Sequence, residues 1–204
     1  MKYIKPTLIL LLICILLYGD KTNAKAIGTF YNFNLQYNSN QVPTANFTLQ
    51  DFTVRWNSTT GNISVIHQNN PSKIIWQNIA NKGFCGAAQG IETITEKAGS
   101  FSIVDRKSNI IQTQTIESII LSNNQLEIKG QLLGAQNTNY TLIISPKSNN
   151  QLHFDYEVGN TDFNRLYLSY ACESNEQFFG FGEQPSHLNH KGNRVPILVQ
   201  EQGI

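Results

Sequence analysis

Two glutamates near the C-terminal end, Glu183 and Glu201, are the side chains of this 204-residue sequence that most directly suggest a chemistry. Cleavage of a glycosidic bond requires a pair of carboxylates, because one protonates the leaving oxygen while the other attacks the sugar or activates water. Both glutamates lie in a stretch rich in glycine, aromatic and amide residues, which is typical of a binding loop on a rigid scaffold. The residues alone leave a second interpretation open, in which Glu183 anchors the loop through backbone N–H groups and Glu201 contacts a ligand or another domain.

Other chemistries have less support in the same stretch. His187 and His190 are spaced to approach one metal ion, but no third ligand follows at a suitable spacing, so we expect a solvated loop pair and no metal. The glycines of Gly180-Phe-Gly182 are not followed by the third glycine of a dinucleotide fingerprint. The chain has no Gly-x-Ser-x-Gly elbow, and its thiols have no neighbouring histidine motif. We therefore expect no cofactor and no covalent catalysis by serine or cysteine.

The run FFGFGEQPSHLNHKGNRVPILVQEQGI, residues 178–204, is specific enough to carry a resemblance. Its Gly-Phe-Gly-Glu-Gln core, its Leu-x-x-Lys-Gly step and its Pro-Ile-x-Val-Gln-Glu-Gln-Gly-Ile end together resemble the end of the N-terminal domain of family 31 glycoside hydrolases. The bacterial α-glucosidase and sulfoquinovosidase branch of that family is the nearest. Upstream, the run GSFSIVD at residues 99–105 is similar to the family pattern, although it is weak alone.

The resemblance implies that this chain is one part of a secreted retaining α-glycosidase. The family carries its two catalytic aspartates on a (β/α)₈ barrel that follows this domain, and no residue here matches those motifs, so we expect no catalytic residue in the chain. A loop of the N-terminal domain reaches over the barrel mouth, where an acidic residue contacts the sugar. By position that substrate-binding residue is Glu201, with Gln200 and Gln202 beside it, while Glu183 and Lys191 shape the loop.

The same resemblance implies that the chain is the N-terminal piece of a truncated or split gene product. Its expected ligand is a carbohydrate, an α-glycoside, and a separate catalytic barrel chain could complete it. Transition-state stabilisation needs both carboxylates and a pocket held in fixed geometry, so we expect no hydrolysis by this chain alone. We also expect Phe178, Phe179, Phe181 and residues 195–199 to be exposed without the barrel, which favours association.

A function from another class is a secreted, non-catalytic carbohydrate-binding module or adhesin-like β-sandwich. In that case Trp56, Trp76 and the phenylalanine-rich loop would present stacking faces to sugar rings. Burial of the two tryptophans between sheets is the more common fate of such residues.

The elements that must position this loop are predicted to be strands. No stretch after residue 27 sustains a 3.6-residue apolar period, whereas period-two alternation recurs between Asn, Gly and Pro turn clusters. Such spacing predicts an all-β fold, an antiparallel β-sandwich, and the resemblance implies a galactose mutarotase-like one. The strongest segments are residues 47–56, with a break or bulge at Gln50-Asp51, and residues 63–65, 74–76, 101–104, 116–121, 126–133, 140–144 and 152–158.

Residues 1–26 are predicted to be a signal peptide, and residues 27–204 a single β-sandwich domain that ends before the missing barrel. Lys2 and Lys5 precede an apolar run at residues 8–18, and small residues follow at Ala24 and Ala26. Eleven apolar residues fall short of the roughly 18 that a membrane-spanning helix needs, so we expect no membrane span after cleavage. The protein is therefore expected to be secreted or periplasmic.

Charge and cysteine content fit an exported protein. The formal net charge of +1 and the low charged fraction of 14% provide no basic surface, so nucleic acid is not an expected partner. Apart from Cys14 in the predicted leader, the chain has Cys85 and Cys172. In an oxidising compartment these two could form a disulfide, and two buried free thiols are the alternative.

Overall fold

The computed structural model describes residues 8–11, 34–35, 42–97, 100–148, 150–179 and 189–192, of which side chains are described outside residues 8–11, 34–35, 100–103 and 148. The chain forms two compact units. One unit comprises Met1–Ile13 and Asn32–Ala171, and the other comprises Cys14–Tyr31 and Cys172–Ile204. The described residues form strands and turns and no helix, so the predicted all-β class is confirmed. No helix that could cross a membrane therefore occurs in this part of the chain.

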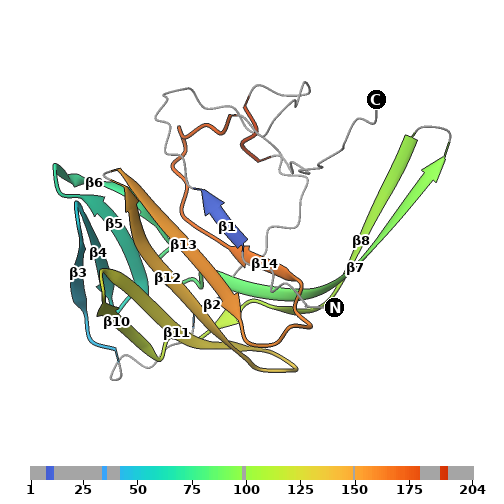
Figure 1. The fold of residues 1–204 in the computed structure, drawn as a ribbon, viewed down its shortest axis with the longest axis horizontal. Coiled ribbons are helices and arrows are strands. Elements are labelled where there is room, and N and C mark those ends of the chain that lie inside the picture. Colours follow the sequence, from blue (N-terminus) through green and yellow to red (C-terminus); the bar gives the residue numbers. More distant parts are fainter. Residues whose placement is uncertain are drawn as a thin grey trace. The chain divides into compact units, whose positions relative to one another are not determined.

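The first unit contains a four-stranded antiparallel meander (Figure 1). Its strands follow one another in sequence and in space, and in residues 52–57 buried side chains alternate with more exposed ones as a half-buried sheet requires. The expected break or bulge at Gln50-Asp51 is a complete reversal of the chain. Leu49 pairs with Phe52, and Gln50 adopts a φ of 51° that suits a tight hairpin turn. The strands are β3 (Ala45–Leu49), β4 (Phe52–Asn57), β5 (Asn62–His67) and β6 (Asn70–Gln77).

A seven-stranded sheet in the same unit has the order β1-β13-β12-β11-β9-β2, and β10 pairs with β11 as well. All its pairs are antiparallel except β2 with β9. The Asn123-Asn124 pair between β10 and β11 has φ values of 48° and 59°, which is the left-handed geometry of the turn predicted there. The strands are β1 (Leu8–Leu11), β2 (Asn34–Leu35), β9 (Thr113–Gln114), β10 (Ser118–Ser122), β11 (Gln125–Leu133), β12 (Thr138–Ser148) and β13 (Gln151–Val158).

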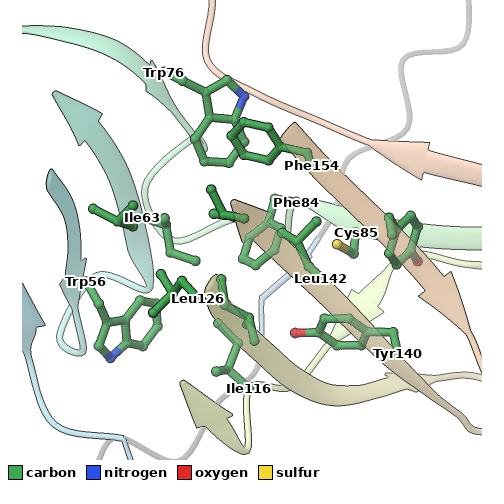
Figure 2. Packing of buried hydrophobic residues seen from close by; sticks show 14 of the residues in the cluster. Trp56, Ile63, Trp76, Phe84, Cys85, Ile116, Leu126, Tyr140, Leu142 and Phe154 are labelled. Atoms are coloured by element: carbon green, nitrogen blue, oxygen red, sulfur yellow. The ribbon is translucent and has the colours of Figure 1, made fainter. Parts of the chain in front are cut away.

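A single apolar core lies between these two sheets (Figure 2). Alternate residues of the meander face alternate residues of β11, β12 and β13, and the Trp76 ring lies 5.1 Å from the Phe154 ring across the interface. The predicted sandwich is thereby confirmed. The fully buried side chains of the core include Trp56, Tyr140, Tyr156, Phe84, Phe154, Leu49, Ile63 and Leu126.

One buried polar side chain, Gln114, links the core to the start of a third sheet, which begins at Cys85. The Gln114 carbonyl oxygen accepts hydrogen bonds from the backbone N–H groups of Phe84 (2.8 Å) and Cys85 (3.2 Å). Its amide nitrogen donates to the Tyr140 hydroxyl (2.6 Å), which in turn donates to the Thr115 carbonyl (2.9 Å). Each buried polar group of this network therefore has a hydrogen-bond partner.

The third sheet has the order β14-β7-β8, and its strands are β7 (Cys85–Lys97), β8 (Ser100–Ile111) and β14 (Arg165–Leu168). β14 pairs only with residues 85–88 of β7, whereas β8 pairs along almost the whole of β7. The outer half of the β7–β8 hairpin therefore continues beyond β14 as two strands (Figure 1).

Candidate functional site

The three predicted substrate-binding residues, Gln200, Glu201 and Gln202, lie outside the described residues, and so does Glu183. What the structure describes is the part of the chain that leads to them. Residues 172–179 and 189–192, all in the second unit, flank segment 180–188 and precede the Val-Gln-Glu-Gln motif. We call these two stretches together the loop base.

Asn189 closes the loop base. Its side-chain oxygen accepts hydrogen bonds from the backbone N–H of Phe178 and from that of Lys191, both at 3.0 Å. The next residue, His190, donates its backbone N–H to the Phe178 carbonyl at 2.8 Å. Phe178 and the stretch 189–191 are therefore held side by side by backbone and amide hydrogen bonds.

Lys191 fastens the same base to the turn that precedes it. Its ammonium group donates to the backbone carbonyls of Glu173 and of Ser174, the latter at 2.9 Å. The Glu176 carboxylate accepts from the Glu173 N–H at 3.1 Å and so closes the turn from the other side. The expected loop-shaping role of Lys191 agrees with these contacts, because charge-assisted bonds to two carbonyls fix a backbone more strongly than neutral ones.

Cys172 stands at the start of the loop base and is exposed. Its thiol donates to the Glu173 carbonyl at 3.4 Å. Partial burial raises the pKa of this thiol above its ordinary value, and the nearby Glu176 carboxylate raises it further, while Lys191 lowers it in part. A thiol with a raised pKa is a weak nucleophile at neutral pH.

Cys85 belongs to the first unit and is fully buried, and burial raises the pKa of its thiol well above the usual range. Both cysteines are free thiols in the structure, and the disulfide between Cys85 and Cys172, weighed against two buried free thiols as the alternative, stays a prediction. Only one of the two, Cys85, is buried as that alternative expected. A thiol count on the exported protein without reductant is the direct test of the disulfide.

The two tryptophans considered for sugar stacking are buried in the structure. Trp56 is 1% exposed and donates its indole N–H to the Val42 carbonyl at 3.0 Å. Trp76 is 5% exposed and packs against Phe154. The suggestion that these tryptophans present faces to a glycan is therefore wrong, because both rings are part of the sandwich core, whereas Phe178 and Phe179 in the loop base are half-buried.

Of the two histidines, His187 and His190, only His190 lies among the described residues. His190 is 6% exposed, and His187 lies outside the described residues. Within the described ranges no group of three or more His, Cys, Asp or Glu side chains is close enough to hold a metal ion. The expectation of a solvated pair is therefore wrong at His190, whose side chain is buried.

Sequence reasoning missed Asn189, the residue that closes the loop base. Asparagine is common throughout this chain, so its type alone carried no information. The signal was its position two residues before the Lys-Gly step, where Gly192 adopts a φ of 76° that favours glycine. A polar side chain just before such a turn is well placed to cap the backbone on both sides.

Comparison with known proteins places the chain in context. A family model described as the glycosyl hydrolase 31 N-terminal galactose mutarotase-like domain matches residues 20–202. The chain is also similar to the sulfoquinovosidase of Escherichia coli (strain K12), with 26% identity over 145 residues. That alignment covers 68% of this chain and 21% of the relative, so the chain spans about a fifth of the relative's length. No solved structure matches the chain significantly.

Proposed function

Because this chain belongs to the family of glycosyl hydrolase 31 N-terminal galactose mutarotase-like domains, we propose that it is the substrate-contacting N-terminal part of a secreted retaining α-glycosidase. In this proposal the catalytic (β/α)₈ barrel and its two aspartates belong to sequence that is not in this chain. The single observation that carries the proposal is the family match over residues 20–202. The similarity to a sulfoquinovosidase supports an α-glycoside as the ligand.

The loop base supports this role by holding the chain that leads to the predicted substrate-binding residues. Asn189 and Lys191 hold the chain at a fixed place shortly before the Val-Gln-Glu-Gln motif. In the proposal, a fixed base lowers the conformational entropy cost of placing the following segment over a barrel mouth. In the proposal, the Glu201 carboxylate accepts hydrogen bonds from sugar hydroxyls beyond the scissile bond, and Gln200 and Gln202 contribute neutral donors and acceptors.

The chain alone is proposed to be inactive. Hydrolysis with retention needs a nucleophile and an acid/base carboxylate held about 5 Å apart across the scissile bond. A substrate-contacting glutamate on a loop positions a sugar but supplies neither group. Purified chain should therefore show no turnover of an activated aryl α-glycoside, and turnover that disappears in a Glu201→Gln variant would contradict the proposal.

The decisive experiment looks for a catalytic barrel encoded next to this chain and tests it together with the chain. We expect the DNA immediately downstream to encode Gly-Arg and then a barrel, and the two polypeptides, expressed together, to hydrolyse an aryl α-glycoside. In that assembly Glu201→Gln should lower kcat/KM by about tenfold to a hundredfold, because a hydrogen bond to a charged group contributes about 1.5–3 kcal/mol. Glu157→Gln, at an exposed position of β13, is the matched control and should leave the rate unchanged.

Two further outcomes separate the proposal from the non-catalytic module. Calorimetric binding of a glycan by the isolated chain, with no catalytic partner encoded nearby, would favour the module. Export is tested by N-terminal sequencing of the protein recovered outside the cytoplasm, for which we expect a start at Ile27. A mature chain that retains Leu8–Leu11, the strand that pairs with β13 in the structure, would contradict cleavage.

A further inference from the structure

We propose that strand β10 (Ser118–Ser122) is a dimerisation edge, on which the β10 strand of a second copy of this chain pairs antiparallel about a two-fold axis at Ile120. Such pairing continues the seven-stranded sheet of one copy into that of the other. This dimer does not depend on the glycosidase role.

β10 is an edge strand of the seven-stranded sheet. It pairs with residues 125–129 of β11 on one side, and no second strand among the described residues pairs with its other side (Figure 1). In an antiparallel pair only alternate residues direct their backbone N–H and C=O groups toward the partner strand, so those of the intervening residues point outwards. The occupant that satisfies an outward row of backbone donors and acceptors is another extended strand.

Aliphatic side chains are exposed beside this backbone edge. Ile120 is 51% exposed and Leu121 is 41% exposed. Leu121 directly opposes Leu126 of β11, which is fully buried in the sandwich core, so both side chains lie on the core side of the sheet. The core therefore ends partly uncovered at β10, and a further strand beside β10 would cover Leu121.

The two outer strands of the four-stranded meander differ from β10. β6 carries Pro71 and Lys73, and its pairing with β5 is irregular. The exposed residues of β3 are the polar Asn46 and Thr48. Charge, proline and irregular pairing are features by which natural sheets prevent pairing with a further strand. β10 has none of these features and exposes aliphatic residues, so its edge is open to a partner strand.

The residue order of β10 identifies the partner as a second copy. The strand reads Ser-Ile-Ile-Leu-Ser, which is nearly the same in both directions. Antiparallel pairing of two copies about Ile120 opposes like with like, in the pairs Ile120 with Ile120, Ile119 with Leu121 and Ser118 with Ser122. The two pairs of Ile119 with Leu121 lie on the core side, and no charge is brought to the contact, so the two copies fit residue by residue.

The two faces of the sheet fix this register. Ile120 opposes Glu127 on the face away from the core, whereas Leu121 lies on the core face. A shift by one residue would oppose Ile120 to Leu121 and would turn the core face of one copy to the side of the other copy's outer face. A shift by two residues keeps the faces but leaves fewer opposed pairs. The register centred on Ile120 is therefore favoured.

Pairing of the same strand from both copies has a consequence for the assembly. Each copy uses its one β10 edge, so the contact closes after two copies and builds dimers rather than open chains. Five residues a side form a small contact, and interfaces below about 1,200 Å² belong to weak complexes, so we expect a dissociation constant of about 0.1–1 mM.

Sedimentation velocity of the full chain across a concentration series tests for the dimer. We expect monomers at about 10 μM and a substantial fraction of dimers at about 1 mM. A chain that remains monomeric throughout this series would overturn the proposal, which includes the case of an edge that accepts only a strand of another protein.

Disulfide trapping tests the register. Directly opposed residues place their Cβ atoms about 4.5–5.5 Å apart, close to the separation that a disulfide spans. In a Cys172→Ala background, which removes the exposed native thiol, Ile120→Cys should give a covalent dimer when oxidised glutathione is added. Ser122→Cys in the same background is the matched control and should stay monomeric, because its counterpart in the other copy lies about 13 Å away along the strands.

A mixture completes the trapping experiment. Ser118→Cys and Ser122→Cys should each fail to cross-link alone and should cross-link to each other when mixed, because these two positions oppose each other in the dimer. Equal cross-linking of Ile120→Cys and Ser122→Cys would indicate random collision, and no cross-linking of Ile120→Cys would indicate no contact. Either result would overturn the proposal.

A charge pair tests the same contact without oxidation. Ile120→Lys and Ile120→Glu each place like charges on the two-fold axis and should be monomeric, whereas their equimolar mixture should associate at least about fivefold more tightly than either variant alone. Failure of the mixture to associate, with two variants that unfold cooperatively, would contradict the two-fold at Ile120. Ile74→Lys, at a 44% exposed aliphatic position of β6, is the control and should dimerise like the unmodified chain. A monomeric Ile74→Lys would mean that added charge acts generally and that β10 is not the contact.

Discussion

Residues 85–88, the inner part of β7, are buried, whereas all residues from Ile91 to Lys97 in its outer part, which we call the ribbon, are exposed. Both parts pair with β8 in one antiparallel hairpin, so strand pairing does not distinguish them. The inner part is joined by β14 and connected through Gln114 to the sandwich core, while the outer part has neither neighbour in the described chain. Strand pairing is thus common to both parts of β7, and burial by neighbouring elements distinguishes the inner part from the outer one.

The largest expected difference between the two regions is the effect of removing an isoleucine. Ile128 of β11 is fully buried in the core, and Ile94 of the ribbon is 63% exposed. We expect Ile128→Ala to lower the free energy of unfolding by about 4 kcal/mol, since the side chain leaves a cavity, and Ile94→Ala to change it by no more than about 0.5 kcal/mol. Urea denaturation of the purified chain measures both.

A milder variant keeps this comparison usable if Ile128→Ala fails to fold. Ile128→Val should lower the free energy of unfolding by about 1 kcal/mol. Equal losses at the two sites would mean that the outer part of β7 is covered in solution.

Much of the sandwich could be predicted from the sequence, because period-two alternation is a local property. The alternation of Leu126 and Ile128 with Glu127 and Lys129 predicts a strand with one wet face, and β11 has that pattern. The same rule could not separate the ribbon from the core. Ile91 and Ile94 have the residue type of core strands, and whether another layer covers them depends on contacts far away in the sequence.

The candidate site was less predictable than the fold for a related reason. Family resemblance directed attention to Gln200, Glu201 and Gln202, which lie outside the described residues. The contacts that define the loop base join Phe178 to Asn189 and Lys191 to Ser174, and no local pattern announces such pairs. The turn at Gln50-Asp51 shows the same limit, because a break in alternation does not state whether the chain bends or reverses.

Gly130 lies in a closely packed environment, whereas Gly192 lies in an open one. A Cβ atom on Gly130 of β11 would overlap the Thr115 carbonyl oxygen, lie 2.8 Å from its carbon and lie 3.0 Å from the Tyr140 ring. Around Gly192 there is open space, and only its φ of 76° disfavours a side chain. We expect Gly130→Ala to cost about 3 kcal/mol of unfolding free energy and Gly192→Ala about 1 kcal/mol. Similar losses in thermal or urea unfolding would show that Gly130 is not tightly packed.

Alkaline pH should destabilise the core. Burial raises the pKa of Cys85, Tyr140 and Tyr156 well above their ordinary values. Above the ordinary thiol pKa of about 8.5, an unfolded chain loses these protons while the folded one keeps them, so stability falls as pH rises. The slope is about 1.4 kcal/mol per pH unit for each such group, beginning with the thiol and steepening near pH 10 where tyrosines join.

Cys85→Ala isolates the first step of this alkaline loss. The variant should show a flatter dependence of unfolding free energy between about pH 8.5 and about pH 10 and an unchanged tyrosine contribution above that range. Cys172→Ala is the control, because Cys172 is exposed and contributes less. An unchanged slope in Cys85→Ala would show that its thiol ionises as readily in the folded state as in the unfolded one.

The smallest effect is expected at the boundary between the two regions, where Arg165 meets the ribbon. Glu92 and Asp105 oppose each other across β7 and β8, and two like charges in that position destabilise a hairpin. Arg165 lies within ion-pair distance of both. Because these groups are partly exposed, Arg165→Met should cost only about 1 kcal/mol, and amide exchange near Gly90 should quicken more than in the core. Adding Glu92→Gln to that variant should recover part of the loss, since one carboxylate is then neutral. A double variant no more stable than Arg165→Met alone would show that repulsion between the carboxylates is not what Arg165 relieves.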